Sequence, residues 1–365
     1  MSSTNGDRTN SRYEVLSKRE TEASLLLFVQ DPVTKQPIVM KILRPYQDPR
    51  YPTRATLSGR QMCQVEALLW NRKFSPGIYI GLASLLKEYQ ENDHEIHIGE
   101  IIEDLSKVDT KADVEYVLLM RQLPEDRCLE TLLDKQNKET HARLKLLTQY
   151  IAQLHMDVNL LAMPLADEGD DNRWGSYAQL QDKLKHNIEL FDSMLEKDKT
   201  GHYLAYTHIP GMLTHVLTHN LYRDYFEHRL QEQRIRRCHG DLKLSNIWLI
   251  PANNDETREH ILLLDAIDFN PVYSNIDILS DFAMLAVDVQ AHIKSFVLVS
   301  EMIEYYLQLT HQESEINRSV LNYYLAEKAM VCAAVSVIYD LSPLGPAYLE
   351  VAQTHVNELK RRLDR

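Results

Sequence analysis

The chain has little cysteine, no long apolar run and no excess of positive charge, and each absence removes a class of protein. Its 365 residues include four widely spaced cysteines and no Cys-x-x-Cys pair, so buried free thiols are expected rather than a zinc site or disulfide framework. No stretch approaches the ~18 consecutive apolar residues of a membrane span. The polar segment Met1–Arg12 lacks an apolar signal core. The net charge of -13 argues against a general nucleic-acid binder.

Several phosphate-binding and repeat patterns are also missing. No G-x-G-x-x-G occurs in the first 40 residues, so a glycine-rich phosphate loop is not indicated there. G-x-x-x-x-G-K-[ST] occurs nowhere, which excludes a P-loop on this chain. Internal repeats and low-complexity tracts are absent as well. We therefore expect a cytoplasmic globular protein with no membrane or nucleic-acid partner, preceded by a short disordered segment at residues 1–12.

The region 13–122 has the pattern of a small β-rich unit. Two apolar runs, Leu25–Val29 and Ile38–Leu43, are joined by the turn-forming residues Asp31–Pro37, which predicts a hairpin. Apolar residues at three- and four-residue steps then predict a helix over 59–74, ended by Ser75-Pro76-Gly77. Further strands are expected at 79–86, 94–103 and 114–120.

From residue 123 to 365 the pattern becomes helical. Helices are predicted at 129–135 and 139–161, then two helices within 176–236 broken near 207–210, and then almost continuously over 277–365 with a break at Ser342–Pro346. A polar loop at 164–175 carries four acidic residues: Asp167, Glu168, Asp170 and Asp171. The fold class predicted is α+β with two lobes, a β-rich lobe at 13–122 and a larger helical lobe at 123–365.

The chemistry-bearing residues lie in residues 238–247 and 261–270. His239-Gly240-Asp241 is followed five residues later by Asn246, and an apolar run then leads to Asp265 and Asp268. A carboxylate can align a hydroxyl and take its proton, while an amide oxygen and a second carboxylate suit Mg²⁺ beside phosphate. Alone, each residue would be read as a turn or loop cap. Together they predict a catalytic loop at 238–247 and a metal segment at 261–270.

Roles within this constellation follow from residue type. Asp241 is the expected catalytic base, His239 a buttress of the loop, and Asn246 a metal ligand. Either Asp265 or Asp268 supplies the metal carboxylate. Asp265 is slightly favoured because it directly ends the apolar run, and both remain candidates.

Four further charged residues suggest supporting roles. Lys41 lies inside an apolar strand, where a cation must reach solvent or meet an anion, and Glu66 in the following helix is its expected partner. Lys243 is placed to neutralise a moving phosphoryl group, or else is a solvated loop lysine. Asp281, near a predicted helix start, is expected to hold the catalytic loop through backbone N–H groups, although a plain helix N-terminal charge would look the same.

These residues resemble the aminoglycoside phosphotransferase-like branch of the protein-kinase-like fold. The resemblance rests on His239-Gly240-Asp241-Leu242-x-x-x-Asn246, Ile267-Asp268-Phe269 and Asp277-x-x-x-Asp281-Phe282-Ala283. A closer similarity is to an uncharacterised bacterial group of kinase-like domains, often fused to a P-loop ATPase. That similarity rests on Glu66, Asn71-Arg72, Pro76 and Tyr79, and on the phrase Val117–Pro124.

The resemblance implies an ATP- and Mg²⁺-dependent phosphotransferase with a two-lobed kinase-like fold. Lys41 and Glu66 would form the ion pair that positions phosphate. Thr21–Ser24, including Ser24, would replace the glycine-rich turn. The backbone of Met120, Arg121 and Gln122 would meet the adenine as the interlobe hinge. Because this chain has no P-loop, an ATPase partner of that kind would be a separate protein.

The acceptor class is where the sequence departs from the family pattern. The resemblance implies a hydroxyl of a small molecule, aminoglycoside-like, bound by the helices of 140–235. The acidic residues of 164–175 would suit a polyamine-like acceptor, although a solvated loop is the simpler interpretation. Lys243 makes the loop read Asp-Leu-Lys, as in many protein kinases, which keeps a protein Ser/Thr acceptor open. A nucleotide-binding regulatory module without turnover is the remaining alternative.

Overall fold

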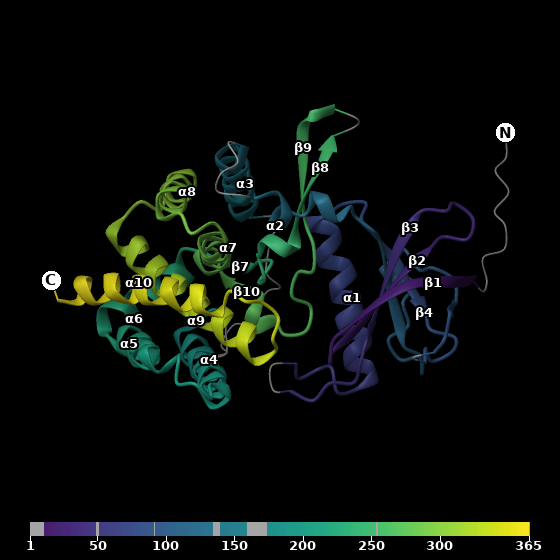
Figure 1. Cartoon of the computed structure of the whole chain (residues 1–365), viewed down its shortest axis with the longest axis horizontal. Coiled ribbons are helices and arrows are strands. Elements are labelled where there is room, and N and C mark those ends of the chain that lie inside the picture. The colour runs from purple at the N-terminus through teal and green to yellow at the C-terminus, as the bar shows by residue number, and fades with distance from the viewer. Residues whose placement is uncertain are drawn as a thin grey trace. The chain divides into compact units, whose positions relative to one another are not determined.

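The computed structural model describes residues 11–48, 51–90, 92–133, 139–158, 174–252 and 255–364. The chain divides into two compact units, one of Met1–Glu125 with Leu262–Pro271 and one of Asp126–Ile261 with Val272–Arg365 (Figure 1). The boundary near residue 125 lies close to the expected one. Most of the metal segment, which we expected in the helical lobe, belongs instead to the first unit.

The first unit is built on an antiparallel sheet, six-stranded within the described residues, in the order β4-β6-β3-β2-β1-β5. Leu85, directly after β4, bridges Ile98 of β5, so the two edges of the sheet meet and the sheet is curled. Ser11 and Arg12, which we expected in the disordered segment, are in β1. The strands are β1 Ser11–Glu20, β2 Ser24–Gln30, β3 Pro37–Leu43, β4 Tyr79–Ser84, β5 Glu95–Ile98 and β6 Tyr116–Arg121.

The helix α1 (Leu57–Phe74) confirms the periodic prediction and packs on this sheet. Its N-cap is Thr56, whose hydroxyl accepts from the Gly59 N–H, and the chain leaves the helix at Ser75. The helix is tied to the sheet by polar side chains, because Gln64 donates to the backbone oxygens of Lys41 and Tyr116. Apolar residues of β1, β2, β3, β5 and β6 form the buried core of the unit.

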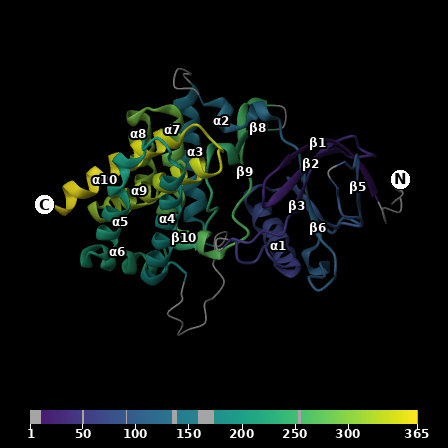
Figure 2. The same cartoon turned by 60° about the horizontal axis from the view of Figure 1, so that its bottom comes forward.

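The second unit is mainly helical. Helix α9 is packed against α4, α7 and α10, and Figure 2 shows α7, α9 and α10 side by side. We expected two helices within 176–236, but His219 breaks the second one, so α5 and α6 are separate. The helices are α2 Leu129–Leu132, α3 Glu139–Met156, α4 Tyr177–Lys197, α5 His208–Thr218, α6 Asn220–Gln231, α7 Ile278–Ile293, α8 Phe296–Leu309, α9 Glu315–Ile338 and α10 Gly345–Leu363.

Two short strand pairs frame the catalytic loop. It follows β7 (Ile235–Arg237) and precedes β8 (Ile247–Ala252). β7 pairs with β10 (Asn275–Asp277), which leads directly into α7, and β8 pairs with β9 (Asp255–Leu263). The catalytic loop and the N-terminal turn of α7 are therefore held next to each other by a ladder. The acidic residues Asp167, Glu168, Asp170 and Asp171 lie outside the described residues.

One helix in the described part of the chain, α9, is long and apolar enough by composition to cross a membrane. Its most apolar window is 72% buried inside the structure. Burial by neighbouring helices accounts for this composition, so we interpret α9 as the core helix of the second unit.

Candidate active site

The backbone of the catalytic loop is hydrogen-bonded to Asp281, in the first turn of α7. The two oxygens of this fully buried carboxylate accept from consecutive backbone N–H groups, Gly240 at 2.8 Å and His239 at 3.1 Å. Gly240 has φ of 85°, a left-handed conformation that a side chain would strain. Burial raises the pKa of Asp281, but the hydrogen bond and charge of His155 and the loop N–H groups outweigh it, so the pKa is lowered. The expected role of Asp281 in holding the loop is thus seen as direct hydrogen bonds.

A buried network fixes Asp281 in turn. His155 Nε2 lies 3.1 Å from its carboxylate, and His155 Nδ1 lies 2.7 Å from the Tyr306 hydroxyl. Cys238 is close enough to His155 and Asp281 for the three to be considered as metal ligands. Burial, however, raises the pKa of the Cys238 thiol well above its usual value. Since both Asp281 oxygens already accept hydrogen bonds, we interpret the cluster as a structural network.

Asp288, which the sequence analysis missed, anchors the other end of the loop. Its carboxylate accepts from the Leu244 N–H at 2.7 Å and from the Tyr348 hydroxyl, and it lies 3.3 Å from His292 Nδ1. Asp288 follows Asp281 by seven residues and so lies on the same face of α7. That spacing was the available signal, but an acidic residue on a helix is common and did not stand out.

The reactive end of the loop presents three polar side chains. The carboxylate of Asp241 lies 2.8 Å from Lys243 Nζ, and Asn246 Nδ2 donates to the backbone oxygen and carboxylate of Asp241 at 3.0 and 3.2 Å. Burial lowers the pKa of Lys243, but the charge of Asp241 outweighs it and the pKa is raised. His239 is the expected buttress, because its Nδ1 accepts from the Asp241 N–H at 3.3 Å. Asp241 is thus held in place while remaining partly exposed.

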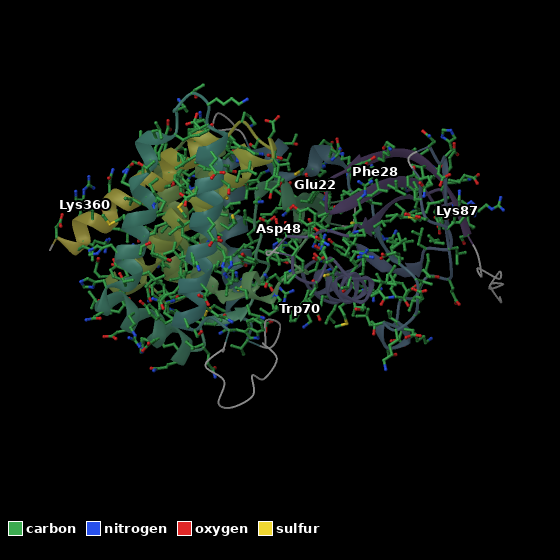
Figure 3. The ribbon with its side chains drawn as sticks, turned by 90° about the horizontal axis from the view of Figure 1, so that it is seen from below. Glu22, Phe28, Asp48, Trp70, Lys87 and Lys360 are labelled. Carbon is green, nitrogen blue, oxygen red and sulfur yellow. The ribbon has the colours of Figure 1, made fainter. Side chains whose placement is uncertain are left out.

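In the first unit, Lys41 pairs with Asp265 and not with Glu66. Lys41 Nζ lies 2.6 Å from Asp265 Oδ1, and Glu66 accepts from Trp70 Nε1 at 2.9 Å. The expected Lys41–Glu66 ion pair is therefore absent from the structure. The physical reason is the register of α1. Gln64 faces the sheet, while Glu66 points along another face of the helix with Trp70, which is labelled in Figure 3.

Asp265 has the features of an available ligand. Its backbone is left-handed, with φ of 59°, a conformation uncommon for a residue other than glycine and often found at functional sites. The backbone is held there because the Asp265 N–H donates to the Tyr79 hydroxyl at 3.0 Å and the next N–H, of Ala266, donates to Asn71 at 2.9 Å. The side chain is 61% exposed.

Asp268 has the features of a structural ion. Its carboxylate lies 2.9 Å from Arg54 Nη2, and both side chains are about 5% exposed or less. The Arg54 guanidinium also lies over the rings of Tyr51 and Phe269, at 5.5 and 5.4 Å from their centroids. The two acidic candidates are therefore different in kind: Asp265 presents its carboxylate to solvent, and Asp268 is enclosed beside a guanidinium.

Several polar groups of the expected hinge and of the expected phosphate-covering turn already make hydrogen bonds within the protein. The N–H groups of Arg121 and Gln122 donate to Ile78 and Pro37, and Met120 pairs within the sheet, so none of these three is a spare donor. The next N–H, of Leu123, has no acceptor within the described residues. The turn Thr21–Ser24 joins β1 to β2, with Glu22 at its tip (Figure 3), and the Thr21 and Ser24 hydroxyls lie 3.0 Å apart.

The donor set fits magnesium chemistry. Carboxylate and amide oxygens are the ligands this ion prefers. Asp265 offers an exposed carboxylate in the first unit. In the second unit Asn246 turns its NH₂ group toward Asp241, which leaves its amide oxygen on the opposite side. Lys41 adds a buried cation suited to phosphate, because burial lowers its pKa but the charges of Asp265 and Asp268 outweigh burial and raise it.

Comparisons with known proteins bear on the fold. Neither a family model nor a curated protein sequence matches this chain. Choline kinase from Cryptosporidium parvum Iowa II is 12% identical, over 97% of this chain and 90% of that one, with a TM-score of 0.53. An ethanolamine kinase from Plasmodium vivax is 11% identical, over 94% and 81%, with a TM-score of 0.46. A GDP complex of a mutant aminoglycoside 2'-phosphotransferase-IIIa is 12% identical, over 95% and 91%, with a TM-score of 0.47.

Identities this low speak to fold and not to activity. The likeness to choline kinase extends over nearly the whole chain, and the elements match the expectation from the sequence, a curled β-sheet unit followed by a helical unit. The chain therefore has a two-lobed, protein-kinase-like fold.

Proposed function

We propose that this protein is an ATP- and Mg²⁺-dependent phosphotransferase whose acceptor is a hydroxyl of a small molecule. The observation that carries the proposal is that Asp241 is both accessible and held in place. Its carboxylate is partly exposed, held by Lys243 and Asn246, on a loop whose backbone is fixed by two buried carboxylates. A chain of kinase-like fold would need such a group to align an acceptor hydroxyl.

The roles of the other residues follow from their chemistry. Asp241 would align the hydroxyl and accept its proton, while Lys243 would offset negative charge on the transferred group. Lys41 would contact nucleotide phosphate. Asn246 and Asp265, rather than Asp268, would hold Mg²⁺, which when bound neutralises phosphate charge. The N–H of Leu123, one residue beyond the expected hinge, meets no acceptor in the described part of the chain and is the best backbone donor for the adenine.

The test separates nucleotide binding from transfer. Mg²⁺ with ATP should raise the melting temperature of the full chain more than ATP alone, because the ligands bind the folded state. Asp241→Asn should keep this response and lose transfer to any acceptor, by a factor of about 10² or more. Ser245→Ala, an exposed neighbour on the same loop, is the matched control and should retain both. Undiminished turnover in Asp241→Asn would refute the proposed role.

Two alternatives have distinct signatures. Pairing of Lys243 with Asp241 favours a protein acceptor as the second candidate, and radiolabelled ATP with a cell extract would then give a labelled protein band that depends on Asp241. A module without turnover would bind ATP with no benefit from Mg²⁺. A separate P-loop ATPase partner and a cytoplasmic location in a bacterium stay predictions, and co-purification from native extract tests the first.

A further inference from the structure

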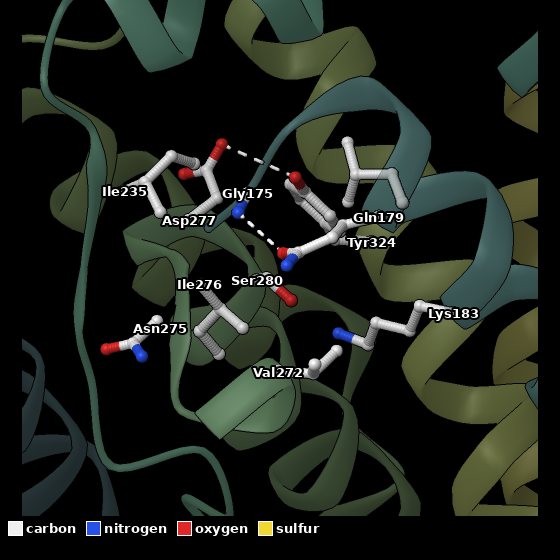
Figure 4. A pocket seen from close by; sticks show the side chains of 11 residues that line it. Gly175, Gln179, Lys183, Ile235, Val272, Asn275, Ile276, Asp277, Ser280 and Tyr324 are labelled. Carbon is white, nitrogen blue, oxygen red and sulfur yellow. Dashed lines mark hydrogen bonds between the residues drawn. The ribbon is translucent and has the colours of Figure 1, made fainter. Parts of the chain in front are cut away.

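A small pocket in the second unit contains a buried lysine that forms no ion pair with a described carboxylate. Lys183 reaches from α4 into the pocket, whose opposite wall carries Ser280 (Figure 4). Lys183 is 8% exposed, and within the described residues no carboxylate oxygen lies within 4.0 Å of its Nζ. Its closest aromatic contact is Tyr273, with Nζ 5.9 Å from the ring centroid. A buried ammonium without a counter-ion is costly, so its presence calls for an explanation.

The neighbouring carboxylates compensate Lys183 only in part. Glu327 lies 3.4 Å from Lys328 on α9 and accepts from Asn187 at 2.5 Å, so it is shared with other groups. The charges of Glu327 and Asp281 act on Lys183 without a direct ion pair. Burial, and after it the charge of Lys328, lowers the pKa of Lys183 to about 7. The cluster holds two lysines and one glutamate, all buried, so an anion entering the pocket would stabilise the charged form of Lys183.

A second buried group aimed at the same space has no partner. Ser280 is 1% exposed, and its hydroxyl makes no hydrogen bond in the described structure. A serine within a helix usually donates to a backbone oxygen one turn earlier, so a spare hydroxyl is unusual. The Asp277 carboxylate also lines the pocket, but it is engaged by Arg229 and by the Tyr324 hydroxyl at 3.5 Å, so it does not compensate Lys183.

The pocket adjoins the catalytic loop within the same unit. Ser280 directly precedes Asp281, whose carboxylate holds His239 and Gly240. On α9, Cys332 lies one turn after Lys328, and the charges of Lys243 and Asp241 act on its thiol. Lys328 and the catalytic loop are therefore neighbours of the same face of α9.

We propose that this pocket binds an anionic group of the phosphate acceptor, a carboxylate or a phosphate, through the Lys183 ammonium and the Ser280 hydroxyl. The inference rests on the proposed function and names its acceptor class: a hydroxy acid or a phosphorylated polyol. Cationic acceptors, such as aminoglycosides or amino alcohols, would place like charges together and are disfavoured.

Inorganic phosphate is the first probe, used without nucleotide. Titrated at constant ionic strength, it should raise the melting temperature of the full chain, and Lys183→Met should remove the rise. Lys185→Met, an exposed lysine on the same helix, should keep it. Lys41→Met should also keep it, which excludes the nucleotide phosphate site. A rise that survives Lys183→Met would overturn the inference.

Stability without any ligand gives a second readout. Lys183→Met removes an amine whose charged form is disfavoured by burial and keeps the length of the side chain, so its melting temperature should equal or exceed that of the wild type. A lower melting temperature would mean that Lys183 only supports the fold, and would count against a binding role.

Kinetics with acceptors sorted by charge complete the test. Anionic hydroxy compounds should be phosphorylated, and Lys183→Met should raise KM for them about tenfold or more with little change in kcat, because the lost contact is remote from the reacting hydroxyl. A preference for cationic acceptors would overturn the inference and leave the phosphotransferase standing. If neither phosphoryl transfer nor a melting-temperature response to Mg²⁺ and ATP is found, the proposed phosphotransferase function is refuted. The phosphate titration would still test whether the pocket binds an anion.

Discussion

At the scale of single residues, Asp265 and Asp268 are only three positions apart, yet their carboxylates lie in different environments. Asp265 is exposed, lies in a left-handed backbone and pairs with Lys41. Asp268 is enclosed against a guanidinium that lies over the rings of Tyr51 and Phe269. The first carboxylate is accessible to a ligand from solvent, and the second is part of the folded interior.

Substituting these two residues should therefore have opposite consequences. Asp268→Asn leaves the Arg54 charge buried without its counter-ion and should lower the free energy of unfolding by roughly 3–5 kcal/mol. Asp265→Asn keeps an oxygen for Lys41, so it should lower the free energy of unfolding by only about 1 kcal/mol. The response of ATP binding to Mg²⁺ should be lost. Urea unfolding and a Mg²⁺ titration with ATP measure the two effects. A stable Asp268→Asn variant that has lost the Mg²⁺ response would reverse our assignment.

The residues also show where prediction from sequence stops. A lysine inside the apolar strand Ile38–Leu43 correctly indicated an anionic partner, but the partner is 224 positions away, and only tertiary structure brings Asp265 there. Glu66 lies in the helix that follows the strand, and the rotation of α1 turns it aside. Asp281 was found because it belongs to a recognisable motif. Arg54, which determines the state of Asp268, lies in a loop with no motif at all.

At the scale of elements, α7 is the support of the catalytic loop, and His292 near its C-terminal end is part of that support. Burial lowers the pKa of His292, but its hydrogen bond and charge interaction with Asp288 outweigh burial and raise the pKa to about 9. His292 also lies 3.0 Å from Glu130, directly after the start of α2. A protonated His292 thus connects α2 to the carboxylate that holds Leu244.

This gives a pH dependence with a defined sign. Because the folded-state pKa is raised, the stabilisation is fully present below about pH 6.5 and is lost as the pH rises through about 9. Its size is at most about 3 kcal/mol. His292→Gln should lower the melting temperature at pH 7 and match the wild type above about pH 9. A difference between the two proteins that is constant from pH 6 to 10 would contradict the assigned protonation.

The elements themselves were predictable where a periodic pattern was long. The β2–β3 hairpin, α1 and the break before α10 fall where turn residues and spacing placed them. The break between α5 and α6 was not anticipated, because His219 lacks the signature of a helix breaker. The path of the segment after β9 was also beyond prediction. Leu262 and Leu263 end β9, and from there to Pro271 the chain belongs with the β-rich unit, which no local sequence signal indicates.

At the scale of the whole molecule, each of the two units has its own buried ion pair. Arg54–Asp268 lies in the first, and Arg229–Asp277, with both side chains about 1% exposed, lies in the second. Units with separate cores often unfold as separate cooperative transitions. We therefore expect calorimetry of the ligand-free protein to show two overlapping transitions.

Variants of the two pairs should identify the transitions. Asp268→Asn should lower one melting temperature and Asp277→Asn the other, since each leaves a buried cation in only one unit. Mg²⁺ with ATP should raise the transition that Asp268→Asn lowers. If both variants shift a single transition by similar amounts, the chain unfolds as one cooperative body and this expectation fails.

Buried and exposed side chains alternate along the catalytic loop, and this decides which of its positions can be substituted. Leu242 and Leu244 are fully buried, while Lys243 is partly exposed and Ser245 is exposed. The backbone on either side is carried by Asp281 and Asp288, whose bonds do not depend on which side chains occupy positions 243 and 245. Position 245 is therefore free to vary while the shape of the loop is kept, whereas Lys243 is engaged by Asp241. Directed evolution that starts from position 245 offers a short route to new acceptors.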